Sequence, residues 1–80
     1  MDDTDIVRRI GELADEEHSL ERAHTGEPLG DAELSRLRDI EESLDQCWDL
    51  LRQRRARRQA GEDPNDATAR STDVVERYQQ

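Results

Sequence analysis

Hydrophobic residues in the centre of the chain recur at alternating spacings of three and four positions, with charged residues between them. They are Leu37, Ile40, Leu44, Cys47 and Leu51. That spacing places them on one stripe of an α-helix. No glycine or proline interrupts the stretch before Gly61. The pattern therefore predicts one long helix over residues 31–60, with most of its circumference in water.

A shorter stripe of the same kind precedes it and consists of Ile6, Ile10, Leu13 and Leu20. It predicts a first helix over residues 5–24, with the hydroxyl of Thr4 as its N-cap. Residues 25–30 contain two glycines and one proline, which end the helix. Helices joined by so short a loop lie antiparallel.

The antiparallel arrangement predicts a register, because facing residues in a hairpin have numbers that add to a constant. Leu13 with Leu44 and Ile6 with Leu51 both add to 57. In this register the second helix extends past the start of the first. Its end is well marked, because Gly61 suits a left-handed C′ position and Pro64 cannot continue the helix.

The chain is thus divided into a helical hairpin, residues 1–61, and a tail, residues 62–80. Turn-forming and charged residues dominate the first part of the tail, so we expect irregular, partly flexible backbone there. A short helix over residues 72–79 is predicted if it docks on the hairpin, because isolated helices of this length are marginal in water.

Several apolar residues lie outside the main stripes, namely Val7, Ala14, Leu34, Trp48 and Leu50. A lone hairpin would leave them in water. With 80 residues, of which 31% are hydrophobic, the chain cannot bury a large core by itself. We therefore expect an all-α, coiled-coil-like antiparallel hairpin that forms a homodimeric four-helix bundle or that packs its tail on the second stripe.

Charge is unevenly distributed in this chain of net charge −9. Residues 52–58 hold five arginines and no acidic residue, and the predicted register leaves most of this segment exposed beyond the first helix. Aromatic and arginine side chains are enriched at binding hot spots. The candidate partner-binding residues are Trp48, Arg52, Arg54, Arg55, Arg57 and Arg58.

These residues favour a small non-enzymatic interaction module, an adaptor or regulator that binds an acidic or helical protein. Nucleic-acid or nucleoprotein association through the same arginines is an alternative. It is less favoured because the rest of the chain is acidic and no aromatic residue lies among the arginines for base stacking.

A second alternative is a dimeric metal-binding bundle. Glu21 and His24 have the Glu-x-x-His spacing of di-iron bundles, and Glu17 lies on the same inward stripe. Carboxylates from a second copy would have to complete such a site, at the solvated loop end of the hairpin. We therefore expect no cofactor. No pattern of nucleophile and base is present in the sequence, so we do not expect an enzyme.

The cellular location is inferred from two features that the sequence lacks. The first residues do not resemble a secretory signal, and no stretch of 18 consecutive apolar residues occurs. We expect a cytoplasmic protein that does not enter a membrane.

Longer sequence runs resemble a known family. The run LDQCWDLLRQRRARRQAGEDP, the connector GEPLGDAEL and Val74-Val75-Glu76 are similar to domain of unknown function 2630, a family of short uncharacterised proteins from GC-rich Gram-positive bacteria. The resemblance implies a complete small protein and brings no activity with it. Members of that family tend to have a threonine where Gly30 stands, which implies a weaker N-cap here.

Overall fold

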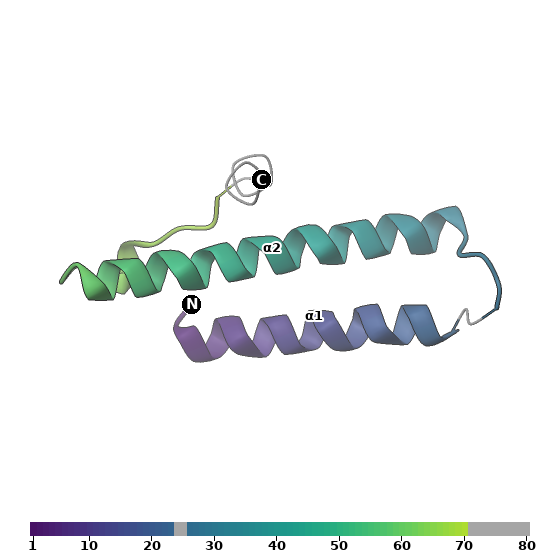
Figure 1. The fold of residues 1–80 in the computed structure, drawn as a ribbon, viewed down its shortest axis with the longest axis horizontal. Helices are drawn as coiled ribbons and strands as arrows, with labels where there is room; N and C mark the ends of the chain where they lie inside the picture. The colour runs from purple at the N-terminus through teal and green to yellow at the C-terminus, as the bar shows by residue number, and fades with distance from the viewer. Residues whose placement is uncertain (24–25, 71–80) are drawn as a thin grey trace.

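The computed structural model is an antiparallel helical hairpin, which confirms the predicted all-α fold. Helix α1 (Asp3–Ala23) and helix α2 (Asp31–Gln59) lie side by side, and a short 3₁₀ helix, η1 (Pro64–Asp66), follows α2 (Figure 1). The structure describes residues 1–23 and 26–70. The short helix predicted over residues 72–79 lies outside these residues.

Helix α1 begins earlier than predicted because Asp2, not Thr4, caps it. The backbone N–H of Asp5 donates to Asp2 Oδ1 at 2.8 Å, and the N–H of Asp2 donates to Asp5 Oδ2 at 3.3 Å. This reciprocal pair is a capping box built from two aspartates. Thr4 therefore lies inside the helix, and Asp3 becomes its first residue.

Helix α2 ends at the predicted place. Gly61 has a φ of 77°, the left-handed conformation that glycine adopts without steric cost. The N–H of Gly61 donates to the Arg58 carbonyl at 3.2 Å, and the N–H of Glu62 donates to the Arg57 carbonyl at 2.8 Å. These two bonds form a Schellman motif, which satisfies the last carbonyls of the helix and reverses the chain.

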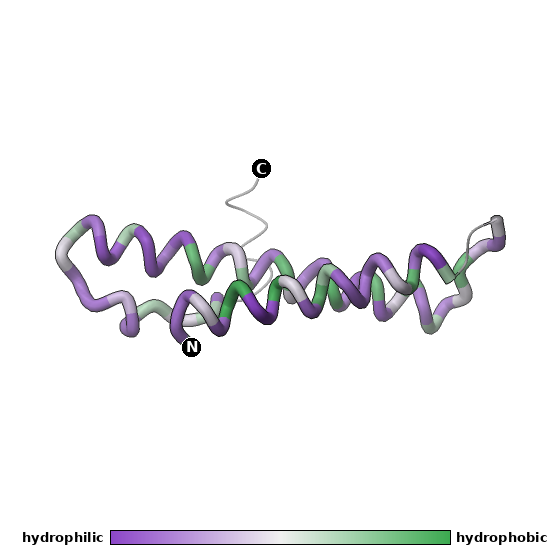
Figure 2. Tube along the Cα trace, turned by 90° about the horizontal axis from the view of Figure 1, so that it is seen from below, coloured by the Kyte–Doolittle hydropathy of each residue, from purple (hydrophilic) through white to green (hydrophobic). Residues whose placement is uncertain are grey.

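The core between the helices is narrow. Among the described residues, the fully buried hydrophobic side chains are Ile6, Leu13 and Ile40, all from the predicted stripes. Figure 2 shows hydrophobic positions recurring along both helices among mostly hydrophilic ones. Val7, Leu34 and Trp48 remain between 46% and 57% exposed. A single copy of the chain therefore leaves much of the second apolar stripe in water.

Ion pairs of Glu16 and Asp3 connect the helices. Arg36 of α2 donates from both Nε and Nη2 to the carboxylate of Glu16 of α1. Arg54 Nε donates to Asp3 Oδ1 at 2.5 Å, and the numbers of this pair add to 57, in agreement with the predicted register. The Arg36 pair is nearly half exposed and contributes little to stability, whereas Arg54 is buried.

Residues 61–70, here called the strap, turn back and follow α2 (Figure 1). Side chains of α2 hold its backbone: Gln53 Nε2 donates to the Thr68 carbonyl at 2.7 Å, and Gln46 Nε2 donates to the Arg70 carbonyl at 3.3 Å. The strap is irregular, as expected, except for η1. It is nevertheless attached along its length through Gln46 and Gln53, whose roles the sequence did not suggest.

Asp49 anchors the end of the strap. Its side chain is almost fully buried and accepts hydrogen bonds from Arg70 Nε at 2.9 Å, from Arg70 Nη2, and from Gln53 Nε2 at 2.9 Å. Burial raises the pKa of the Asp49 carboxyl, but the hydrogen bonds from Arg70 and Gln53 outweigh it. The net pKa is lowered, so Asp49 is ionised at neutral pH.

Candidate functional site

Arg54 does not belong to an exposed arginine surface. The side chain is only 6% exposed. Besides Asp3, it reaches the strap, where Nη1 donates to the Pro64 carbonyl at 3.2 Å and to Asn65 Oδ1 at 3.1 Å. The prediction that Arg54 is exposed for a partner is therefore wrong. It failed because α1 begins at Asp3 and because the strap folds back over this side chain.

Two further arginines of the cluster form ion pairs within the chain. Arg58 Nη2 lies 2.7 Å from Asp3 Oδ2, and Arg57 Nη1 donates to Glu62 Oε2 at 3.2 Å. The guanidinium groups of Arg58 and Arg54 lower the pKa of the Asp3 carboxyl. The predicted register places Asp3 level with Arg54, but a helix that starts at residue 5 leaves Asp3 outside it, so the sequence analysis did not pair them.

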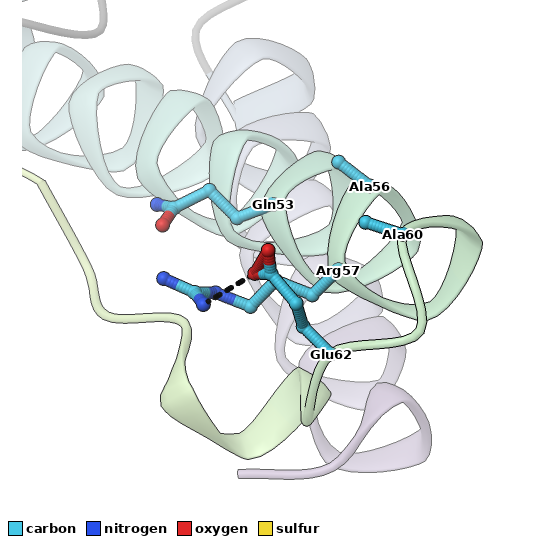
Figure 3. Close-up of a pocket in the computed structure, with 5 residues that line it drawn as sticks. All are labelled: Gln53, Ala56, Arg57, Ala60 and Glu62. Atoms are coloured by element: carbon cyan, nitrogen blue, oxygen red, sulfur yellow. Dashed lines mark hydrogen bonds and ion pairs between the residues drawn. The ribbon is translucent and has the colours of Figure 1, made fainter.

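The Arg57–Glu62 pair spans a shallow hollow of about 350 Å³ at the end of α2 (Figure 3). Gln53, Ala56 and Ala60 line the rest of it. Figure 3 shows the long Gln53 and Arg57 side chains on one side and only the two alanine methyl groups on the other. This hollow offers a ligand little beyond groups that already bind one another.

The remaining arginines, Arg52 and Arg55, are exposed. Neither forms an ion pair with any residue in the described ranges 1–23 and 26–70. They border a second hollow, of about 390 Å³, between α1 and α2. Its lining consists of Asp3, Val7, Trp48, Leu51, Arg52, Arg55 and Arg58. We call it the Trp48 hollow.

The Trp48 hollow combines apolar and cationic groups on a fixed frame. Trp48 is 49% exposed and Val7 is 57% exposed, so a partner that covers them gains hydrophobic burial. Arg52 and Arg55 follow Trp48 by four and seven positions, which places all three on one face of α2. An indole flanked by unpaired guanidinium groups suits an apolar, negatively charged partner surface.

The structure thus brings together four of the six predicted partner-binding residues. They are Trp48, Arg52, Arg55 and, paired with Asp3 at the rim, Arg58. Sequence reasoning assigned Val7 to the second stripe but did not place it beside Trp48. That juxtaposition depends on the packing of α1 on α2. The predicted register gave one indication of it, because the numbers of Val7 and Leu51 add to nearly 57 and Leu51 lines the same hollow as Trp48.

The predicted metal candidates are only partly within the described residues. Glu17 is half-buried and Glu21 is exposed, whereas His24 lies outside the described residues. Over the ranges that the structure does describe, no group of three or more His, Cys, Asp or Glu side chains is placed to hold a metal ion. Cys47 is partly buried, which raises the pKa of its thiol and keeps it protonated at neutral pH.

Charged residues recur along the whole length of both helices. Neither helix in the described part of the chain is both long and apolar enough to cross a bilayer.

Comparisons with known proteins identify relatives but no activity. Residues 2–80 match the family described as "Protein of unknown function (DUF2630)". Uncharacterised proteins of Mycobacterium bovis and Mycobacterium tuberculosis are 47% identical to the chain over 77 residues, which cover 95% of this chain and 88% of each relative. No solved structure matches.

Proposed function

Because the chain belongs to the DUF2630 family, whose description assigns no activity, we propose its function from its surface. We propose that it is a small non-enzymatic interaction module, an adaptor or regulator. Its Trp48 hollow binds an acidic amphipathic helix of a protein partner. The apolar side of that helix covers Trp48 and Val7, and its carboxylates pair with Arg52 and Arg55.

The observation that carries this proposal is the half-exposed Trp48 on a rigid helix. Leaving an indole half in water forgoes hydrophobic stabilisation, and covering it on binding recovers this. The two neighbouring arginines without ion pairs select the charge of the partner more than they add affinity. A helical partner suits a hollow that runs between two helix axes, because its side chains can enter between the rows of residues.

Nucleic-acid association has weaker support. Arg54, Arg57 and Arg58 are engaged in ion pairs, so two arginines of the cluster remain for phosphates. The net charge of −9 repels a polyanion. A salt-dependent mobility shift with duplex DNA or RNA would favour this alternative.

Trp48 is the single tryptophan of the chain, so its fluorescence reports directly on the hollow. The probe is a synthetic amphipathic helical peptide with an apolar stripe flanked by glutamates, titrated into protein at low micromolar concentration. We expect a saturable blue shift of the Trp48 emission. A matched peptide with glutamine in place of glutamate should bind up to about tenfold more weakly, since each of the two ion pairs that it lacks contributes up to ~1 kcal/mol.

Protein variants complete the test. Arg52→Glu/Arg55→Glu should lose binding to the acidic peptide, whereas Asp39→Arg, an exposed charge reversal about 180° around α2 from Trp48, should retain it. Unchanged Trp48 emission when the monomeric protein is titrated, or equal affinity of the double variant, would overturn the proposal.

A further inference from the structure

The proposed function leaves the partner unnamed, and the charge pattern of α2 identifies one. Resting on that function, we infer that the acidic helix bound at the Trp48 hollow is α2 of a second copy of this chain. The two copies pack antiparallel about a two-fold axis that passes near Trp48. Each copy then supplies both the hollow and the helix that fills the other copy's hollow.

One face of α2, centred on the exposed Trp48, is divided into an acidic and a basic half. At 100° per residue, its members fall within about 80° of one another around the helix. The face consists of Leu34, Glu41, Asp45, Trp48, Arg52 and Arg55. The acidic residues precede Trp48 and the basic residues follow it. Such a face is complementary to its own antiparallel copy.

The pairing can be tested by residue numbers, since facing residues of antiparallel helices add to a constant. The residue numbers of Trp48 and the partner's Trp48 add to 96. Those of Arg55 and Glu41 also add to 96, and those of Arg52 and Asp45 add to 97. Each pair of charges occurs twice in the dimer because of the two-fold axis. One arrangement therefore aligns both kinds of charge and the tryptophan to within one position.

These four charged side chains are available for such pairs. Within the described residues, Glu41, Asp45, Arg52 and Arg55 form no ion pair in a single copy. This contrasts with their neighbours along the helix, since Arg54, Arg57 and Arg58 are all paired. Arg54 and Arg57 point away from this face and are paired within the chain, whereas Arg52 and Arg55 on it form no ion pair with the described residues.

The size of the core favours a second copy over a lone hairpin. Three fully buried hydrophobic side chains among the described residues are few for a chain of 80 residues. The molecule measures 50 × 25 × 16 Å, so its thinnest dimension is close to that of a single helix. A copy placed over Trp48 and Val7 adds a second layer and completes a four-helix arrangement.

The strap does not obstruct this face. The α2 side chains that hold the strap backbone are Gln46 and Gln53. They lie about 140–160° around the helix from Trp48. The strap and the second copy can therefore occupy α2 at the same time.

A charge-swap experiment tests the inference. Sedimentation equilibrium of the wild type should give a mass near twice 9.3 kDa. Glu41→Arg alone and Arg55→Glu alone should each raise the dimer dissociation constant at least about tenfold, because each places two pairs of like charges together. An equimolar mixture of the two variants should restore dimers, since the arginine introduced at position 41 of one copy then faces the glutamate introduced at position 55 of the other.

The mixture distinguishes contact between copies from an effect on folding. Positions 41 and 55 are about 21 Å apart along one helix, so they cannot compensate each other within a chain. The double variant Glu41→Arg/Arg55→Glu should also dimerise, and Asp39→Arg should behave as wild type. Far-ultraviolet circular dichroism should show equal helix content for all of them.

Two results would overturn the inference: a monomeric wild type up to millimolar concentration, or a dimer that the single variants leave intact. A monomer that still binds the acidic peptide through Trp48 would leave the proposed function standing. A chain in which neither the peptide nor a second copy changes Trp48 emission would refute both.

Discussion

At the scale of single residues, two neighbouring arginines have opposite roles. Arg54 is buried and joins α2 to Asp3 at the start of α1 and to η1. Arg55 is exposed and forms no ion pair with the part of the chain that the structure describes. A rotation of about 100° around the helix separates them. Both lie in the same arginine run, so this rotation and the surroundings of each side chain together assign the roles.

Replacement of Arg54 by lysine should reveal the difference. A lysine ammonium cannot reach both Asp3 and the strap in the fixed fork geometry of a guanidinium. We expect Arg54→Lys to lower the free energy of unfolding by about 1–2 kcal/mol. Arg55→Lys, the matched control, should change it by less than about 0.5 kcal/mol. Urea unfolding followed by circular dichroism measures both, and equal effects would contradict the assigned roles.

Asp49 makes stability depend on pH. Burial raises the pKa of its carboxyl, but the hydrogen bonds from Arg70 and Gln53 lower this pKa by more. The folded-state pKa therefore lies below the ordinary value of 3.8. A carboxyl with a lowered folded-state pKa stabilises the fold above its unfolded pKa, and this stabilisation is lost as pH falls through the folded pKa. Wild-type stability should therefore fall below about pH 4.

The variant Asp49→Asn isolates this contribution. Removing the charge that Arg70 pairs with should destabilise the fold by about 1–3 kcal/mol at neutral pH, near the lower value because Arg70 is partly exposed. Below about pH 4, its stability should decline less steeply than that of wild type, as measured by thermal unfolding over a series of acidic buffers. Parallel curves for the two proteins would show that Asp49 is not the titrating group.

At the scale of elements, the helix ends set which segments lie beside Arg54. Asp2 caps α1 ahead of the predicted start, and the Schellman motif at Gly61 sends the strap back along α2. Both features put Asp3 and η1 beside Arg54. A start at residue 5 would have removed Asp3 from the helix and left Arg54 and Arg58 without this carboxylate.

The start of α2 can be improved. Gly30 has extended dihedral angles, φ −73° and ψ 170°, and makes no side-chain cap. The hydroxyl of a serine there can accept a hydrogen bond from a backbone N–H of the first turn, and serine has fewer conformations than glycine in the unfolded chain. Gly30→Ser should therefore stabilise the protein by roughly 0.5 kcal/mol. A Cβ at this position lies 2.6 Å from Glu33 Oε2, but that flexible carboxylate can move away.

The control lies in the same loop. Gly26 has a φ of 83°, so Gly26→Ser should destabilise by about 1 kcal/mol, as expected when a side chain is forced into the left-handed region. Differential scanning calorimetry should show opposite shifts of the melting temperature for the two variants. A loss of stability in Gly30→Ser would show that Glu33 cannot yield.

At the scale of the whole molecule, the chain has three kinds of helix surface. One face of α2 packs on α1, a second holds the strap, and a third exposes Trp48 between acids and arginines that form no ion pair with the described residues. The first two are satisfied within the chain. The third is the surface from which the proposed interaction and the proposed antiparallel dimer both follow.

The sequence by itself determined the hairpin. Helical periodicity, the glycines and proline of the connector, and the stop at Gly61 act over a few residues. Local patterns therefore suffice to predict two antiparallel helices and the two stripes that include Ile6, Leu13 and Ile40. Trp48 with Arg52 and Arg55 was likewise predictable as one face of α2, because helix geometry fixes which residues share a face.

Only the tertiary structure decided which charges are used inside the molecule. Residues 61–70 have no periodicity, and the strap is held by contacts between groups 10 to 24 positions apart, such as Gln46 with Arg70 and Arg54 with Pro64. Many arginine and carboxylate combinations are possible at such separations, and sequence spacing does not distinguish them. Three-dimensional packing buries Arg54 and Asp49 and leaves Arg52 and Arg55 exposed.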